Sequence, residues 1–371
     1  MDVLSRCSIV SDVESAVADL ARQFSGIRLS TLMYFASSAH EPAEVSRLMR
    51  DAFPGVKTFG CTSFKEMTAA GVHDGSITAV GFSHGPDEVI AATVTERIST
   101  SCCAIENAFA RLEAQLGCKL MDLDYTGHFG ILLFDHRVPD FDRHIEQIGN
   151  LSDITFIGGG AGDDYSFQRI HVYFDGKVCD GEIVLVAVKL NDRIKLVKTQ
   201  NVQPAGRSFL VTGFDRERRV LLTLDDRPAL EVYAEALGLR VDELSDEVFR
   251  RFPVGIMFGK QPFVRTIDHA TEDGGIRFFF PFTEGMRLEL MNQLDIVETT
   301  SQALAKAREE LGSIRAVIDF DCVNRILILG EAGRQDEYIR LFAGTEMAGF
   351  ATFGEAYIGL VNQTGVMAVL A

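Results

Sequence analysis

Two stretches of this chain follow one pattern: Gly60-Cys61-Thr62-Ser63-Phe64-Lys65-Glu66-Met67, and Gly349-Phe350-Ala351-Thr352-Phe353-Gly354-Glu355-Ala356 near the end. In both, a glycine follows an apolar run, and hydroxyl residues, a phenylalanine, one further residue and a glutamate come after it. The flanks match too, since each stretch has a predicted strand and helix upstream and a predicted strand at the same offset downstream. This similarity predicts a duplicated structural unit.

A third, more divergent unit lies between the two copies. It runs from a predicted strand at 131–134 through a helix at 139–148 to a final strand at 183–188, and contains the glycine run Gly158-Gly159-Gly160-Ala161-Gly162-Asp163-Asp164. Each unit is predicted to be a strand, a helix, a strand, a glycine-acid loop and a strand. The expected fold class is therefore mixed α/β, built from repeated units.

Two features mark the organisation outside the repeats. Val13, Val17, Leu20 and Phe24 recur at helical spacing and predict an amphipathic helix. The segment 195–201 and a loop with a proline and a glycine at 204–206 predict the boundary between two halves. We therefore expect modules at 28–203 and 204–371.

Composition excludes several classes of protein. The formal charge of −17 disfavours a nucleic-acid or anionic-membrane partner, and no apolar run approaches the roughly 18 residues that a membrane span requires. The seven cysteines have no metal-like spacing, and with no signal peptide they fit a reducing cytoplasm. Cys102 and Cys103 are adjacent and cannot form an ordinary bridge with each other.

These motifs together resemble a known family. The stretch beginning at Gly60, followed by GVHDGSITAVGF at 71–82, resembles the N-terminal module of FIST-domain proteins, whose loop reads Gly-Cys-Ser/Thr and ends in Gly-Glu. The segment 212–238 resembles the opening of the C-terminal FIST module. The resemblance continues through Phe320-Asp321-Cys322-Val323-Asn324-Arg325, Gly354-Glu355 and Asn362-Gln363-Thr364.

The resemblance implies a bacterial or archaeal sensory protein that signals through a separate partner, such as a histidine kinase or a cyclic-nucleotide enzyme. Binding of small ligands, including amino acids, is proposed for the family, and one subgroup of stand-alone members is described as haem-based nitric-oxide sensing. Two positions depart from the family pattern. Lys65 stands where glycine is usual, and Val361 stands where histidine is frequent.

The glycine-acid loops are the first candidate site. Loops that follow strand ends gather at one edge of an α/β unit, so these loops are expected to face a shared cleft. The residues expected to contact a ligand there are Gly60, Cys61, Thr62, Ser63, Glu66, Asp163, Glu355, Asn362 and Thr364. A carboxylate could hold an ammonium group. Alternatively, each glutamate could cap a following element by accepting backbone N–H bonds.

A haem site is a second hypothesis. Aligning the units on their strand phenylalanines places these residues at equivalent strand ends: Ser37, His136 and Cys322. His136 is the candidate haem ligand, and Cys322 and Cys61 are alternatives. Alternatively, His136 only forms a hydrogen bond within a turn, and the two cysteines are small residues of the apolar core. No Cys-x-x-Cys-His occurs, which excludes covalent haem attachment.

Arg325 and the cysteines leave further alternatives open. Arg325 could bind a ligand carboxylate in a bidentate manner, or it could pair with Asp321. Cys61 or Cys322 could serve an enzyme as nucleophile, although no Cys-His-Asn order is discernible. The favoured hypothesis is a non-enzymatic cytoplasmic sensor that binds haem for nitric oxide, or an amine or amino acid without haem. A scaffold without a ligand is the remaining alternative.

Overall fold

The computed structural model describes residues 2–83, 85, 88–135, 137–138, 141–190, 193–279 and 281–371. The chain forms two compact units. Unit 1 consists of Met1–Thr199, Thr300–Leu360 and Thr364–Ala371, and unit 2 of Gln200–Thr299 and Val361–Gln363. Helices alternate with strands, and the described strands form four sheets, which confirms the mixed α/β class. Because the chain returns to unit 1 at Thr300, this unit contains segments from both modules predicted at 28–203 and 204–371.

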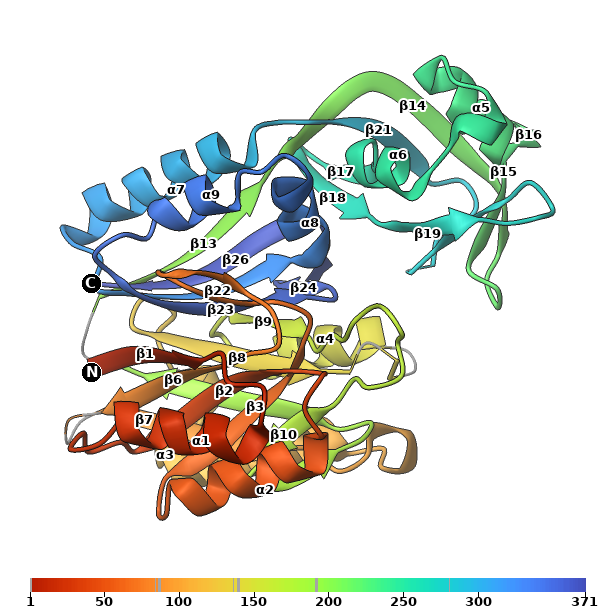
Figure 1. The fold of residues 1–371 in the computed structure, drawn as a ribbon. Coiled ribbons are helices and arrows are strands. Elements are labelled where there is room, and N and C mark those ends of the chain that lie inside the picture. Colours follow the sequence, from red (N-terminus) through yellow and green to blue (C-terminus); the bar gives the residue numbers. More distant parts are fainter. Residues whose placement is uncertain are drawn as a thin grey trace. The chain divides into compact units, whose positions relative to one another are not determined.

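Unit 1 contains three copies of one order of elements (Figure 1), so the predicted repeats are confirmed. Copy 1 consists of β1 (Asp2–Ser8), α1 (Val13–Gln23), β2 (Thr31–Ser37), α2 (Pro42–Ala52), β3 (Lys57–Ser63), β4 (Glu66–Thr68), β5 (Gly71–His73) and β6 (Ile77–Ser83). Copy 2 consists of β7 (Val89–Val94), the 3-10 turns η1 (Ile98–Thr100) and η2 (Leu120–Asp122) on either side of α3 (Ala104–Leu116), then β8 (His128–Phe134), α4 (Phe141–Asn150), β9 (Phe156–Gly160), β10 (Val172–Phe174), β11 (Lys177–Cys179) and β12 (Ile183–Lys189). Copy 3 consists of β13 (Ile194–Gln200), α7 (Ile296–Leu311), β22 (Ala316–Cys322), α8 (Val323–Glu331), α9 (Gln335–Arg340), β23 (Glu346–Thr352), β24 (Glu355–Tyr357), β25 (Leu360–Val361) and β26 (Thr364–Leu370).

Each copy contributes four strands to its own sheet, in the orders β1-β6-β2-β3, β7-β12-β8-β9 and β13-β26-β22-β23. The last two strands of each order are parallel and are connected through helices, as parallel strands require. The short hairpins, by contrast, are exchanged. The β4–β5 hairpin of copy 1 pairs with β23 of copy 3, β24 of copy 3 pairs with β9 of copy 2, and the β10–β11 hairpin of copy 2 pairs with β3 of copy 1. The three copies therefore complete one another's sheets in a closed cycle.

The glycine that opens each copy of the pattern is explained by these parallel pairs. Gly60 lies opposite Tyr34, and Gly349 lies opposite Asp319 at the matching position. A Cβ atom on Gly60 would lie 1.8 Å from the Tyr34 carbonyl oxygen, and one on Gly349 would lie 2.1 Å from the Asp319 carbonyl oxygen. No side chain fits at such a distance, so both positions require glycine.

The helices of copy 1 show how local sequence positions a covering layer. The Asp12 carboxylate accepts the Ser15 N–H at 2.9 Å and caps α1. The predicted amphipathic pattern is confirmed, because Val17 and Leu20 of α1 are buried. Pro42 begins α2 at a position that needs no N–H donor. Both helices pack on the sheet of copy 1 (Figure 1).

Unit 2 interrupts copy 3 between β13 and α7. Its elements are β14 (Val202–Asp215), β15 (Val220–Leu224), β16 (Arg227–Pro228), α5 (Ala229–Leu237), η3 (Val241–Glu243), α6 (Asp246–Arg251), β17 (Val254–Phe258), β18 (Gln261–Arg265), β19 (Ile267–Ala270), β20 (Ile276–Phe278) and β21 (Arg287–Gln293). The strands of unit 2 form one sheet in the order β18-β17-β21-β14-β15-β20-β19, with β16 beside β15. Its core includes Phe209, Tyr233 and Phe249.

The prediction of a loop around Pro204 and Gly206 is wrong. Both residues lie within the long strand β14, where the pairing with β21 shifts register between Pro204 and Ser208. Gly206 has a φ of +79°, which glycine tolerates at such an irregularity. Proline and glycine therefore mark a bulge here, and not the end of a strand. In the described part of the chain, no helix has the length and hydropathy needed to cross a bilayer.

Candidate functional site

The three glycine-acid segments meet in unit 1. We name them loop 1 (60–66), loop 2 (158–171) and loop 3 (349–355), each including the end of the strand before it. Backbone hydrogen bonds join every pair of loops: Gly162 N–H to Thr62 O (3.0 Å), Phe353 N–H to Gly160 O (3.0 Å), Gly160 N–H to Gly354 O (2.8 Å) and Ala351 N–H to Lys65 O (2.9 Å). The convergence that the strand ends predicted is therefore present.

Aromatic side chains from all three loops pack together at this meeting point. Tyr165 of loop 2 has its ring centroid 5.3 Å from that of Phe64 in loop 1 and 5.2 Å from that of Phe353 in loop 3. Phe167 lies 5.4 Å from Phe353. Tyr165 is 39% exposed, and the other three rings are half-buried. We call these four residues the aromatic junction.

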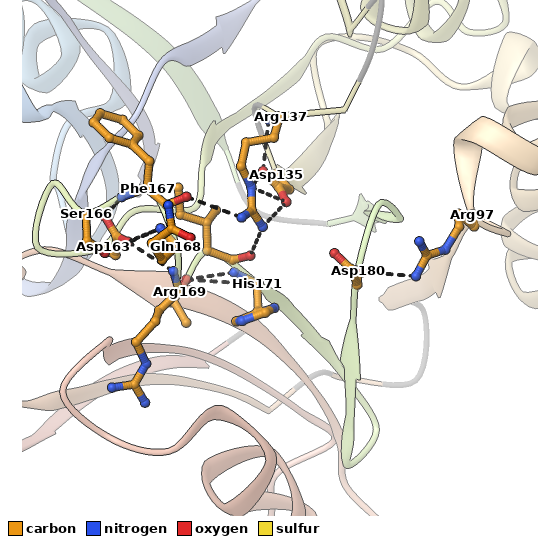
Figure 2. A network of polar contacts seen from close by, with 12 residues as sticks. Arg97, Asp135, Arg137, Asp163, Ser166, Phe167, Gln168, Arg169, His171 and Asp180 are labelled. Atoms are coloured by element: carbon orange, nitrogen blue, oxygen red, sulfur yellow. Dashed lines mark hydrogen bonds and ion pairs between the residues drawn. The ribbon is translucent and has the colours of Figure 1, made fainter.

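Loop 2 holds its two rings with unusual backbone geometry. Tyr165 and Phe167 have φ angles of +66° and +54°, which bulky side chains rarely adopt. The buried Asp163 carboxylate holds the loop in place by accepting four hydrogen bonds (Figure 2), from Ser166 Oγ (2.7 Å) and the N–H groups of Phe167 (3.1 Å), Gln168 (2.9 Å) and Arg169 (3.1 Å). Burial alone would raise the pKa of Asp163, but these donors lower it below its usual value. Asp163 thus acts within its loop.

A paired arginine supports the same loop from the other side. Arg137 binds Asp135 in a bidentate manner, with Nε 2.9 Å from Oδ1 and Nη2 2.6 Å from Oδ2 (Figure 2). It also donates to the carbonyls of Phe167 (3.3 Å) and Ile170 (2.8 Å). The Arg137 charge is therefore already matched by Asp135, and its role is to position loop 2.

His171 ends loop 2 beside this pair. Its backbone N–H donates to the Thr62 hydroxyl at 2.9 Å, which also lies 3.3 Å from the His171 carbonyl oxygen. Among the described residues, the buried Nδ1 of its ring has no hydrogen-bond partner. Burial lowers the pKa of His171, and the nearby Arg137 charge lowers it further.

Charged groups flank the aromatic junction on loops 1 and 2. Lys65 forms an ion pair with Asp74, and its Nζ lies 5.3 Å from the centroid of the Phe64 ring. The exposed Asp164 directly precedes Tyr165. Aromatic faces thus lie next to both signs of charge at a partly exposed surface.

The predicted glutamates lie in the core. Glu66 is fully buried and accepts hydrogen bonds from the Ser63 hydroxyl (2.5 Å), the Ser76 hydroxyl (2.6 Å) and the Ser76 N–H (3.2 Å). Burial raises the pKa of Glu66 to about 7, against these donors. Its contacts tie the end of β3 to the start of β6, which matches the capping alternative.

Glu355 repeats this arrangement in copy 3. It is also fully buried, and it accepts from the Thr352 hydroxyl (2.7 Å) and the Thr364 N–H (3.3 Å). Burial raises the pKa of Glu355 well above its usual value, although a hydrogen bond from Cys322 acts in the opposite direction. A hydroxyl three residues before each glutamate is therefore its partner.

Arg325 lies in a buried network and not at the aromatic junction. Its Nε lies 2.6 Å from Asp321 Oδ1, and Nη2 lies 3.1 Å from the Thr300 hydroxyl. The Tyr338 hydroxyl lies 2.5 Å from Asp321 and 3.2 Å from Asp319. All the charged members are inaccessible to solvent. Of the two alternatives for Arg325, the structure shows the pairing with Asp321.

The remaining predicted residues are dispersed. Cys61 and Cys322 are buried, and burial raises the pKa of the Cys61 thiol well above its usual value, which opposes a nucleophilic role. Asn362 belongs to unit 2, where its side-chain oxygen accepts the Thr266 N–H at 3.4 Å. His136 lies outside the described residues. The described residues contain no cluster of three His, Cys, Asp or Glu suited to a metal ion.

Tyr165 and Phe167 were not predicted as site residues. Their signal in the sequence is weak. Copy 2 is so divergent that the sequence does not show which of its residues correspond to Phe64 and Phe353. The shared phenylalanine of the two clear copies was the usable signal, since both rings reach the aromatic junction.

Comparisons with known proteins agree with the family resemblance of the sequence motifs. The model of the FIST N domain matches residues 30–227, and that of the FIST C domain matches residues 229–357. The chain is 26% identical over 187 residues to the uncharacterized protein MJ1623 of Methanocaldococcus jannaschii; the match covers 47% of this chain and 36% of that protein. Two solved structures are similar only at low TM-scores. A cyanuric acid hydrolase has a TM-score of 0.34 at 12% identity, covering 100% of this chain and 98% of that one, and T. maritima PurL has 0.21 at 11% identity, covering 99% and 72%.

Proposed function

This chain belongs to the FIST family, and from that premise we propose that it is a sensory protein that binds a small organic amine or amino acid at the aromatic junction. FIST domains are associated with sensing in signal transduction. The ligand would contact the exposed face of Tyr165 and the rings beside it. The signal would pass to a separate protein, with a histidine kinase or a cyclic-nucleotide enzyme as the expected partner.

The observation that carries this proposal is the backbone of loop 2. Two bulky residues, Tyr165 and Phe167, keep positive φ angles that cost on the order of 1–3 kcal/mol each. Such strain persists only where surrounding contacts over-determine the conformation, and here the Asp163 hydrogen bonds do so. Strained residues cluster at binding sites, and these two direct aromatic rings to a partly exposed surface.

The chemistry of the site favours a cationic group. Aromatic faces attract ammonium groups electrostatically, and the exposed Asp164 next to Tyr165 can supply a carboxylate partner. The net charge of −17 also attracts cations to the protein. An amino acid would bring a carboxylate as well, and Lys65 on loop 1 is the nearby cation.

Coupling to a partner can use the linked loops. Each loop belongs to a different copy, and backbone bonds connect all three, so a ligand that touches several rings acts on all copies at once. A difference in ligand affinity of about 1–3 kcal/mol between two states is sufficient to shift a signalling equilibrium.

The haem version rests on residues that the structure does not test. The candidate ligand His136 lies outside the described residues, and the alternatives Cys61 and Cys322 are buried. An absorption spectrum of protein expressed with a haem supply tests this version directly. A stoichiometric Soret band that shifts with nitric oxide would overturn the haem-free proposal.

Ligand binding is tested by calorimetry with a panel of amines, amino acids and a quaternary ammonium compound. We expect a cationic ligand to bind the wild type, and Tyr165→Ala to weaken binding about 3- to 30-fold, the range of a cation–π contact. Tyr125→Ala is the matched control, because Tyr125 is 72% exposed outside the three loops. A ligand whose affinity is equal in wild type and Tyr165→Ala, or a panel without any binder, would overturn the proposal.

A further inference from the structure

Two thiols lie side by side on the surface of copy 2, in a segment outside the three loops. Cys102 and Cys103 occupy the turn between η1 and α3, and both are exposed. Their sulfur atoms are 3.4 Å apart. The other five cysteines are also free, and each of them is buried or half-buried: Cys7, Cys61, Cys118, Cys179 and Cys322.

We propose that Cys102 and Cys103 form a reversible dithiol–disulfide couple that low-molecular-weight disulfides, of which oxidised glutathione is an example, oxidise. The short distance between the sulfur atoms means that either thiol can reach the other without movement of a second element. Exposure of both residues gives the oxidant access. The pair requires no partner chain.

The reaction proceeds in two exchange steps. First, the Cys102 thiolate attacks one sulfur of the small disulfide, a mixed disulfide forms on Cys102, and a small thiolate leaves and takes up a proton. Second, the Cys103 thiolate attacks the Cys102 sulfur and releases the second small thiol. In sum, two protein thiols and one small disulfide give one protein disulfide and two small thiols, so atoms and electrons balance.

The surroundings of Cys103 favour this order of attack. A hydrogen bond with Cys102 and its negative charge raise the pKa of the Cys103 thiol, and the nearby Glu106 and Glu96 act in the same direction. Because the pKa of Cys103 is raised, we assign the first attack to Cys102 and the second to Cys103, whose sulfur lies 3.4 Å away. Cys103 is the resolving thiol, held within reach for the second step.

The bond between neighbouring residues is strained and easily reversed. Adjacent Cα atoms are about 3.8 Å apart, whereas ordinary disulfides join Cα atoms roughly 4.4–6.8 Å apart. Strained disulfides are more readily reduced than structural ones. This is why adjacency excludes an ordinary stabilising bridge and suits a labile one.

Formation of the Cys102–Cys103 disulfide is expected to affect the start of α3. The Cys103 carbonyl accepts the Asn107 N–H at 2.9 Å, in the first turn of that helix. Further along, α3 is fixed to β7, because Arg111 donates to the Val94 carbonyl (2.7 Å) and Gln115 donates to the Ala92 carbonyl (3.2 Å). Oxidation is therefore expected to loosen the first turn while the rest of α3 stays anchored.

The test uses the full, reduced chain treated with oxidised glutathione, followed by acid quenching and intact-mass and peptide mass spectrometry. The wild type should lose two hydrogen atoms in the peptide with both cysteines and keep no glutathione. Cys103→Ser should accumulate glutathione on Cys102. Cys118→Ser, which changes a half-buried cysteine outside the pair, should behave as the wild type does.

Two further readouts separate the couple from simple surface reactivity. Phenylarsine oxide should bind once per chain with loss of one water, and either Cys102→Ser or Cys103→Ser should abolish this dithiol binding. Hydrogen exchange at 104–107 should increase on oxidation and return after reduction. Persistent glutathione adducts on the wild type, or a disulfide between two chains, would overturn the proposal.

Discussion

Copies 1 and 3 of unit 1 share one backbone plan but differ in the layer between sheet and helices. Their parallel pairs β2/β3 and β22/β23 match over seven residues each. In copy 1, Tyr34 and Ala36 face an apolar cluster that includes Met49. In copy 3, the equivalent residues are Asp319 and Asp321, which face charged and polar side chains. One architecture thus accommodates an apolar layer or an ionic one.

The opposite face of these strands explains why both layers are tolerated. Phe35 of β2 packs on Phe350 of β23 with ring centroids 4.5 Å apart, and on Phe320 of β22 at 6.3 Å. All three rings are completely buried. The sheets are therefore held by apolar burial on their shared side, which leaves the helix side free to diverge.

The largest effect is expected from the ionic layer. Arg325→Met removes the cation and leaves Asp321 buried without its partner, so the free energy of unfolding should fall by about 3–5 kcal/mol. Urea denaturation of the full chain measures this loss.

A triple variant sharpens the comparison. Asp319→Leu with Asp321→Ala and Arg325→Met makes this layer apolar, as it is in copy 1, and should recover much of the lost stability because no charge remains buried. A triple variant less stable than Arg325→Met alone would show that copy 3 requires its ionic layer.

The glutamate contacts should behave alike in both copies. Glu66→Ala and Glu355→Ala each remove a buried carboxylate that accepts from hydroxyl and N–H donors, which costs about 1–3 kcal/mol. Urea midpoints of the two variants should be lowered to a similar extent. A large loss in one copy only would break the equivalence of the two contacts.

Stability should also depend on pH through Glu66. Its pKa is about 7 in the folded chain against 4.5 when unperturbed, so the folded state keeps a proton that the unfolded state releases. This stabilisation is complete below about pH 4.5 and disappears as pH rises through about 7. Relative to Glu66→Gln, the wild type should therefore lose stability between about pH 5 and pH 8 in urea titrations. Parallel pH profiles would contradict the raised pKa.

The last comparison concerns the residue before each glutamate. Gly354 has a φ of +100°, whereas Lys65 at the equivalent position is not among the residues with positive φ. Gly354→Lys should cost about 1–3 kcal/mol through backbone strain. Lys65→Gly should cost less than about 1 kcal/mol, because its ion pair with Asp74 is largely exposed on the Asp74 side. Thermal unfolding of both variants checks this asymmetry, and equal losses would contradict it.

Local elements with a clear pattern were predictable. The helix at Val13–Gln23 follows from apolar residues at helical spacing, and the repeated strands follow from matching apolar runs. Helix α8 was not predicted, because its start at Cys322 lacks a side-chain cap and its run Ile326-Leu327-Ile328-Leu329 has no helical alternation. The strand β14 was misjudged because a proline and a glycine mark its bulge.

The repeat, the mixed α/β class and the family could be predicted from the sequence, because they depend on local patterns that recur along the chain. The sequence also indicated that the three loops would meet, although the strands before them, β3, β9 and β23, lie in three different sheets. The roles of the key side chains, by contrast, depend on contacts that form only in the folded chain. Glu66 and Glu355 are in the core and Tyr165 is at the surface because the hairpins cross between copies, and residues far apart in sequence set the burial of each group.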